Sequence, residues 1–271
     1  MIDFIVYLTS RQSIKTMKLN FKKLGSSENK VVVLHGLFGS LDNWMTHGKE
    51  LSENGYEVYL VDQRNHGKSP HSEGHDYDLM ASDLQEFLED HHIKNPNLIG
   101  HSMGGKTVMH YAMNFSNSIH KMMVVDIAPK YYLPHHDTII QAFRSVELST
   151  LTSRKEAQNA MENYVSDPGV LQFLLKNLDR TSNGFNWKVN LDVLELNIEN
   201  IGQSYEFRHP CYVNTLFVRG SKSNYILNED RDLLKLHFPN SNMVTIRDAG
   251  HWVHAEQYEN FIKTLKFFLN A

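Results

Sequence analysis

A serine between glycines occurs in the stretch GHSMGGKT, residues 100–107. Its first five residues follow the pattern G-x-S-x-G, which places a nucleophile, Ser102, on a sharp turn between a strand and a helix. All eight residues also follow G-x-x-x-x-G-K-[ST], a loop that binds phosphate through its backbone and a lysine, here Lys106. The two patterns assign different chemistry, so the rest of the sequence must decide between acyl transfer and nucleotide binding.

The residues around this stretch favour the nucleophile. A phosphate-binding loop usually follows the first strand of its domain, whereas two apolar runs typical of strands, residues 31–34 and 57–61, precede this one. Asp126, at the end of the next apolar run, resembles a magnesium-binding Asp but follows Thr107 too closely. We therefore expect Ser102 to attack a carbonyl carbon, activated by a general base.

A serine nucleophile needs two N–H donors for the oxyanion that forms on its substrate. The first is the backbone N–H of Met103, which directly follows the serine at the start of the expected helix. The second comes from the loop HGLFGS after residues 31–34, where Leu37 or Phe38 offers its N–H. We expect Leu37 and Met103 to form this oxyanion hole.

The general base is expected late in the chain, after the last strand of the sheet. The stretch DAGHWVHAE, residues 248–256, places His251 between a short turn and the final helix. Histidine is suited to this work because its ordinary pKa lies near neutral pH. The order of glycine-rich loop, serine and late histidine along the chain predicts a serine hydrolase.

Six stretches now support a resemblance to a known family: HGLFGSLDNW, DQRNHGKSPHS, GHSMGGKTVM, VVDIAP, RGSKSNYI and AGHWVHAE. From about residue 30 to the C-terminus, the chain resembles the α/β-hydrolase superfamily, and more closely its YbfF-like branch of small esterases. The resemblance implies an α/β fold with an eight-stranded, mostly parallel sheet, helices on both faces and a helical cap. It also implies hydrolysis of esters or thioesters without a cofactor.

The acid that orients the histidine departs from the common pattern of the superfamily. In most members it lies in the loop after the strand that follows the cap, but RGSKSNYI, residues 219–226, contains no carboxylate. Resemblance to the YbfF-like branch implies that Asp126 of VVDIAP is the acid and that Ser223 supports it. Asp126 could instead stabilise the turn before the cap, and the other candidates for the acid are Asp248 and Glu195.

The pattern of apolar residues predicts where these side chains are held. Strands are expected at 31–34, 57–61, 97–100, 121–126, 212–218 and 242–246, and helices at 76–92, 103–115, 228–238 and 253–269. This alternation predicts a parallel sheet flanked by helices, and it stops between residues 129 and 210. We expect a core of residues 17–128 and 211–271, a helical cap of 129–210 and an N-terminal extension of 1–16.

Several side chains are expected near the site without a catalytic role. Phe38 and Trp252 flank the catalytic loops and are candidates for the pocket wall. His35 could contact the substrate or could hold the loop that carries Leu37. Lys106 is expected on the helix after Ser102, with its charge in solvent.

The composition limits the classes of function. A net charge of −4 gives no electrostatic case for nucleic acid or an anionic membrane. The single cysteine, Cys211, excludes an internal disulfide and indicates a reducing compartment, so we expect a cytoplasmic protein. The 16 histidines show no spacing typical of a zinc site, and neither a metal nor another cofactor is expected.

The sequence thus predicts an esterase for short- to medium-chain acyl esters or thioesters, acting as a monomer or homodimer. A carbon–carbon bond hydrolase or a lyase with the same Ser-His-Asp triad is one alternative, since the cap determines the substrate. A non-catalytic receptor for a small ligand is the other alternative. It would bind its ligand tightly without turnover.

Overall fold

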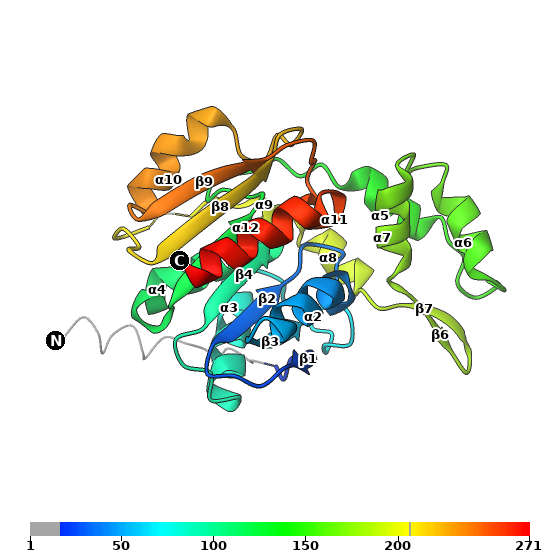
Figure 1. Ribbon diagram of the computed structural model, residues 1–271. Coiled ribbons are helices and arrows are strands. Elements are labelled where there is room, and N and C mark those ends of the chain that lie inside the picture. The colour runs from blue at the N-terminus through cyan, green and yellow to red at the C-terminus, as the bar shows by residue number, and fades with distance from the viewer. Residues whose placement is uncertain (1–16, 206) are drawn as a thin grey trace, which may run out of the picture.

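The computed structural model describes residues 17–205 and 207–271, so the expected extension of residues 1–16 lies outside the description. A seven-stranded sheet runs through the molecule in the order β1-β3-β2-β4-β5-β8-β9 (Figure 1). Its strands are β1 (Phe21–Leu24), β2 (Lys30–Leu34), β3 (Glu57–Val61), β4 (Asn97–His101), β5 (Lys121–Val125), β8 (Asn214–Gly220) and β9 (Ser241–Ile246). All neighbouring pairs are parallel except β1 and β3.

The described residues supply seven strands of this sheet where the resemblance implied eight. β1 is the edge strand on one side and β9 is the edge strand on the other. Met17 donates its backbone N–H to Asp83 of the adjacent helix at 3.2 Å, and the chain then runs directly into β1. The central strands are apolar and buried on both faces because helices cover both sides of the sheet.

Helices cover both faces of the sheet, as expected (Figure 1). One face packs against α2 (Met45–Glu53), α11 (Val253–Glu256) and α12 (Tyr258–Asn270). The other face packs against α3 (Tyr77–Asp90), α4 (Met103–Phe115) and α10 (Arg231–His237). The short 3₁₀ helices are η1 (Leu41–Trp44), η2 (Ser116–Ser118) and η3 (Asn228–Asp230).

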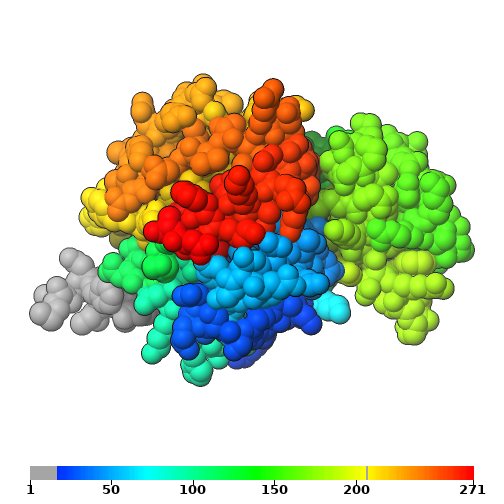
Figure 2. Space-filling view, in the orientation of Figure 1, coloured from blue at the N-terminus to red at the C-terminus, as the bar shows by residue number. Residues whose placement is uncertain are grey.

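Between β5 and β8 the chain leaves the sheet and forms a lobe at one side of the molecule (Figure 2). We call residues 129–210 the cap segment. It contains α5 (Asp137–Arg144), α6 (Arg154–Met161), α7 (Pro168–Leu175), α8 (Leu191–Leu196) and α9 (Ile198–Gly202). It also contains an antiparallel hairpin of β6 (Leu178–Thr181) and β7 (Gly184–Trp187), so it is not purely helical.

The two ends of the cap segment lie side by side. Tyr205 donates its backbone N–H to the carbonyl oxygen of Pro129 at 3.2 Å. Tyr132 donates its backbone N–H to the carbonyl oxygen of Gly202 at 2.8 Å. The cap segment is therefore inserted at one place in the fold, next to the carboxyl end of β5.

Candidate active site

The sheet brings the expected site residues together at its carboxyl edge. Ser102 directly follows β4 and Asp126 directly follows β5, and these strands are neighbours in parallel register. Ser102 donates its backbone N–H to the carbonyl oxygen of Val125 at 2.9 Å. His251 comes from the loop after β9, two strands further along the sheet. Ligand sites in open parallel sheets lie at this edge.

The turn at Ser102 has the strained backbone of a nucleophile elbow. Ser102 has a φ of 52° and a ψ of −117°, a conformation that a residue with a side chain rarely adopts. A Cβ atom on Gly100 would lie 2.2 Å from the carbonyl oxygen of Gly104, and a Cβ on Gly104 would lie 2.4 Å from that of Leu34. Only glycine fits at both flanks, which explains the G-x-S-x-G spacing.

Ser102, His251 and Asp126 form one hydrogen-bonded chain. Ser102 Oγ lies 3.0 Å from Nε2 of His251, and Nδ1 of His251 lies 2.8 Å from Oδ2 of Asp126. Because an ionised carboxylate only accepts hydrogen bonds, Nδ1 carries the ring proton and Nε2 is left to accept from the serine. Ser102 Oγ therefore has a base positioned to remove its proton.

Burial sets the charge states of His251 and Asp126 in this hydrogen-bonded chain. It lowers the pKa of His251 below the ordinary 6.5, so the imidazole is neutral at pH 7 and can act as a base. It raises the pKa of Asp126, whose side chain is completely buried. Hydrogen bonds from the Ser223 hydroxyl and from the Gly220 N–H oppose that rise because they stabilise the carboxylate.

The other two candidates for the acid lie elsewhere. Asp248 is exposed and forms ion pairs with Lys222 and Arg247 on the surface. Glu195 is also exposed and accepts hydrogen bonds from Arg144, on the outside of the cap segment. Of the three carboxylates considered, only Asp126 contacts the histidine.

The expectation that the charge of Lys106 reaches solvent is wrong. Its side chain is buried, and Nζ donates to the carbonyl oxygens of Gly202 (3.1 Å) and Gln203 in the cap segment. Burial lowers its pKa to about 7. The amino group lies at the end of α9, where the Gln203 carbonyl has no other donor among the described residues and the Gly202 carbonyl also accepts from the Tyr132 N–H. This orientation leaves the loop without the lysine that a phosphate site requires.

The loop after β2 has the form expected of an oxyanion donor. Gly39 donates its N–H to the carbonyl oxygen of Gly36 at 2.9 Å, and Phe38 has a φ of 58° inside this turn. Within residues 17–205 and 207–271, no acceptor binds the N–H of Leu37. The N–H of Met103 is also free of a helical partner, because Met103 is the first residue of α4.

Buried side chains hold this loop from both sides. Nε2 of His66 accepts from the Phe38 N–H at 3.1 Å, and the Asn177 side chain donates to the Phe38 carbonyl at 2.7 Å. Asn177 belongs to the cap segment, so the cap contacts the loop directly. His35 donates from Nδ1 to the carbonyl of Gly36 at 2.8 Å and is 1% exposed. Burial lowers the pKa of His35 to about 4, so it is a neutral support for the loop.

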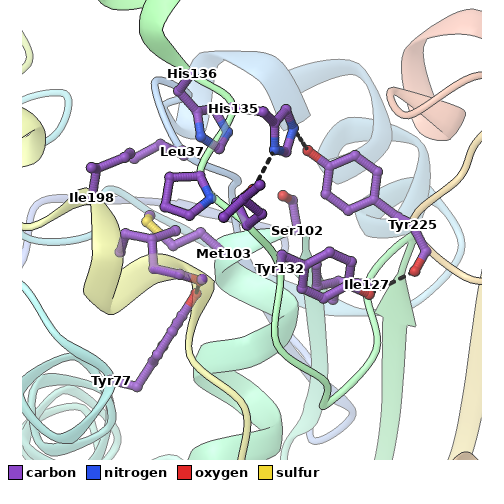
Figure 3. A pocket seen from close by; sticks show the side chains of 14 residues that line it. Leu37, Tyr77, Ser102, Met103, Ile127, Tyr132, His135, His136, Ile198 and Tyr225 are labelled. Carbon is purple, nitrogen blue, oxygen red and sulfur yellow. Dashed lines mark hydrogen bonds between the residues drawn. The ribbon is translucent and has the colours of Figure 1, made fainter.

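A pocket opens above Ser102 between the sheet and the cap segment (Figure 3). Most of its wall is apolar or aromatic, from Leu37, Tyr77, Met103, Ile127, Tyr132, Leu133, Pro134, Ile198, Ile201, Gly202 and Tyr225. His135 and His136 add polar groups at the side of the cap segment.

The pocket-wall candidates Phe38, Trp252 and His35 are not among the residues that line this pocket. Phe38 is buried under the cap segment against Phe143, because its backbone turn directs the side chain away from Ser102. Trp252 packs between His251 and Phe173.

Sequence reasoning missed Tyr225, although it belongs to the quoted stretch RGSKSNYI. An aromatic residue two positions after Ser223 was the feature that could have indicated a contact with the site. Asn177 gave no signal, because it reaches the loop at Phe38 only through the fold of the cap segment.

The described part of the chain offers neither a metal site nor a membrane-spanning helix. It contains no cluster of three His, Cys, Asp or Glu side chains arranged to hold a metal ion. None of the helices in residues 17–205 and 207–271 has the length and apolar character needed to span a bilayer.

Comparison with known proteins identifies the family of this chain. Residues 29–258 match the family model described as the alpha/beta hydrolase fold. Over 246 residues, 88% of this chain and 78% of the relative, the chain is 38% identical to the sn-1-specific diacylglycerol lipase ABHD11 of Danio rerio. It is 36% identical over 262 residues to Esterase YbfF of Escherichia coli, covering 94% of this chain and 100% of the relative.

A solved structure described as a marine microorganism esterase superposes with a TM-score of 0.90 at 40% identity, covering 93% of this chain and 100% of that one. The chain therefore belongs to the α/β-hydrolase family. Within that family it falls in the YbfF-like branch and is a serine ester hydrolase of the carboxylesterase type.

Proposed function

We propose that Ser102, His251 and Asp126 are the catalytic triad of this esterase. Ser102 attacks the carbonyl carbon of the ester while His251 takes the hydroxyl proton on Nε2. Asp126 orients His251 and stabilises the imidazolium that forms. The single observation that supports these roles is the continuous hydrogen-bonded chain, with distances of 3.0 and 2.8 Å, that ends at the pocket.

The backbone N–H groups of Leu37 and Met103 are the proposed oxyanion hole. Both residues line the pocket with Ser102, and neither N–H has a hydrogen-bond acceptor among the described residues. A Cβ on Gly36 would lie 3.2 Å from Cβ of Ser102, so this loop packs against the nucleophile. Two such donors stabilise the negative charge on the tetrahedral intermediate.

The reaction then proceeds through an acyl-enzyme. His251 returns its proton to the leaving alcohol or thiol as the bond to the acyl carbon breaks. Water enters, His251 removes one of its protons, and attack on the acyl carbon releases the acid and regenerates Ser102. Each step uses the neutral imidazole as base and the imidazolium as acid, and no cofactor takes part.

The substrates we propose are short- to medium-chain acyl esters or thioesters. The pocket wall is mainly apolar, which suits an acyl chain, and neither an arginine nor a lysine is among its lining residues. We also propose a core of residues 17–128 and 211–271 with 129–210 as its cap. A cytoplasmic location and a monomeric or homodimeric state remain predictions.

Hydrolysis of p-nitrophenyl esters from acetate to dodecanoate tests the proposal. We expect the wild type to turn over with a burst of one p-nitrophenol per chain. Ser102→Ala should lose both burst and turnover, and Ser149→Ala, on the exposed surface of the cap segment, serves as the matched control. Turnover that survives in Ser102→Ala would overturn the assignment of the nucleophile. The chain-length optimum measures the reach of the pocket.

A further inference from the structure

The ring of Tyr225 lies flat against the imidazole of His251. The two ring centroids are 3.8 Å apart and the planes are inclined by 18°. Tyr225 comes from the loop after β8, and its ring forms one side of the pocket above Ser102 (Figure 3). One face of the histidine therefore contacts an aromatic π system rather than water.

Two hydrogen bonds of its backbone fix the position of Tyr225. Its backbone N–H donates to Oγ of Ser223 at 3.2 Å, and the same hydroxyl binds Asp126. Its carbonyl oxygen accepts from the Tyr132 hydroxyl at 2.6 Å (Figure 3). The ring is thus attached to the acid of the triad through its own backbone, and its geometry over His251 does not depend on packing alone.

The hydroxyl of Tyr225 is held by His135. Nδ1 of His135 donates to the carbonyl oxygen of Leu133 at 3.0 Å, and in the tautomer that this contact fixes, Nε2 accepts from the Tyr225 hydroxyl at 2.7 Å (Figure 3). A phenol that donates its proton has a more electron-rich ring. This contact therefore increases the negative charge on the ring face that His251 meets.

We infer that Tyr225 is a positioning residue that stabilises the imidazolium form of His251 through the face of its ring. His251 is neutral in the resting enzyme and becomes positively charged only when it holds the proton of Ser102. A cation against an aromatic face is attracted by the quadrupole of the ring. The contact is stronger in the transition state than in the ground state, so it contributes to rate and not merely to binding.

Several other titratable groups face His251 and contribute to the charge it can hold. Asp126, after β5, stabilises the imidazolium by hydrogen bonding to Nδ1. His101, on β4, donates from Nε2 to the carbonyl oxygen of His251 and is buried, as is His254 on α11. His135, before α5, opposes the positive charge on His251 only when both of its own nitrogens are protonated. Substitution of the Tyr225 side chain removes its contact with His135 and does not delete the hydrogen bonds that Asp126 and His101 make to His251.

The inference rests on the proposed triad, and substitutions at residue 225 test it. Tyr225→Phe keeps the ring and removes the hydroxyl, whereas Tyr225→Leu removes the π system but retains apolar bulk. For the leucine variant we expect kcat to fall about 3- to 30-fold, a range set by typical cation–π attraction. The phenylalanine variant should lose less. Tyr131→Leu, at a half-exposed tyrosine of the cap segment, is the matched control.

The readout that separates electrostatics from packing is the pKa of the imidazolium in a tetrahedral adduct. An alkyl trifluoromethyl ketone forms this adduct with Ser102, and the downfield proton resonance on Nδ1 reports the titration of His251. We expect the leucine variant to titrate about 0.5 to 1.5 pH units lower than the wild type. The phenylalanine variant should titrate close to the wild type.

The outcomes are distinct. If the wild type forms no adduct, the proposed triad fails. If the wild type forms the adduct but the leucine variant titrates at the same pH, the inference about Tyr225 is overturned, even when kcat has fallen. If the leucine variant does not fold, progressive fluorination of the ring in the Tyr225→Phe background keeps its shape and reduces its quadrupole. The pKa must then fall with each fluorine, and a constant value would reject the inference.

Discussion

Ser223 and His251 both donate hydrogen bonds to the same oxygen atom, Oδ2 of Asp126. Ser223 occupies the loop after β8, where a related hydrolase would ordinarily carry the acid itself. The carboxylate instead comes from the neighbouring strand, β5, and the serine supports it across the gap between the two strands. In the proposed triad, the acid therefore follows one strand, and the serine that supports it follows the neighbouring strand.

Loss of the carboxylate charge at Asp126 is expected to abolish most of the activity. Asp126→Asn leaves the shape of the site but removes the charge that fixes the tautomer of His251, and kcat should fall about a thousand- to ten-thousandfold. Steady-state hydrolysis of a p-nitrophenyl ester measures this loss. Asp248→Asn, at an exposed carboxylate three residues before the histidine, is the control and should retain wild-type kcat. Equal losses in both variants would contradict the assignment of Asp126.

Ser223→Ala tests the support of the acid. The variant removes one donor from a buried carboxylate, and a hydrogen bond to a charged group typically contributes about 1.5–3 kcal/mol. We expect kcat to fall by about tenfold or more, with little change in KM. Ser221→Ala, in the same loop but exposed, should leave kcat unchanged. A Ser223→Ala enzyme as fast as the wild type would show that Gly220 and His251 suffice to hold Asp126.

The activity should persist at pH values where an ordinary histidine is already protonated. His251 acts as a base only when neutral, and burial lowers its pKa below 6.5. Activity is lost as the pH falls through the pKa of the folded enzyme, so the acid limb of kcat/KM should lie below pH 6.5. A pH profile of kcat/KM for the free enzyme measures it. An acid limb at or above pH 6.5 would contradict the expected effect of burial.

Asn177 should control the oxyanion hole from the cap segment. Asn177→Ala leaves the buried carbonyl of Phe38 without its donor, so the turn that carries Leu37 loses one of three side-chain contacts and keeps those of His66 and His35. We expect kcat to fall by about tenfold, less than the roughly hundred- to thousandfold effect of losing an oxyanion donor outright. Asn183→Ala, on the exposed hairpin turn of the cap segment, is the control. A change in KM alone would place the role of Asn177 in substrate binding.

Lys106 should make stability depend on pH in a characteristic direction. Its pKa is lowered to about 7 in the folded chain and is ordinary in the unfolded chain. Between these values the unfolded state binds more protons, so the lysine contributes a stability that rises with pH from about 7 toward 10. Lys106→Met removes this dependence and leaves the carbonyl of Gln203 without a donor, which costs about 1–3 kcal/mol, whereas the Gly202 carbonyl still accepts from the Tyr132 N–H.

Thermal unfolding of both proteins between pH 6 and 9.5 checks this prediction. The difference in melting temperature between wild type and Lys106→Met should widen as the pH rises. Lys155→Met, at an exposed lysine of the cap segment, should show no such trend. A difference that stays constant from pH 6 to 9.5 would mean that the lysine keeps its charge in the folded chain, which would contradict the lowered pKa.

Much of the core was predictable because its signals are local. Loops that contain both glycine and histidine directly follow three strands, β2, β3 and β9, and the parallel sheet brings their ends to one edge. The helix expected at 76–92 is confirmed as α3, since Asp76 accepts a hydrogen bond from the Leu79 N–H at 2.8 Å and caps its start. The spacing of apolar residues in this segment was sufficient to predict the helix.

The cap segment was harder to predict because its contacts are long-range. Asp167-Pro168-Gly169 is a sequence typical of a turn, but in the structure Asp167 caps α7 and Pro168 occupies its first turn, where a missing N–H has no cost. Lys106 was misplaced for a related reason. Its partners are carbonyls nearly a hundred residues away, and nothing in the sequence near α4 identifies them.

The hydrogen bonds that join Pro129 to Tyr205 and Tyr132 to Gly202 close the cap segment at its base. Because the two ends of the cap segment meet at this one seam, the segment between them can be lengthened, shortened or replaced without separating β5 from β8. Ser102, His251 and Asp126 lie on the sheet side of that seam. Most residues that line the pocket, and would contact the acyl chain, belong to the cap segment. We therefore expect changes in the cap segment to alter the range of acyl chains without displacing the proposed triad, provided that Asn177 still holds the loop that carries Leu37.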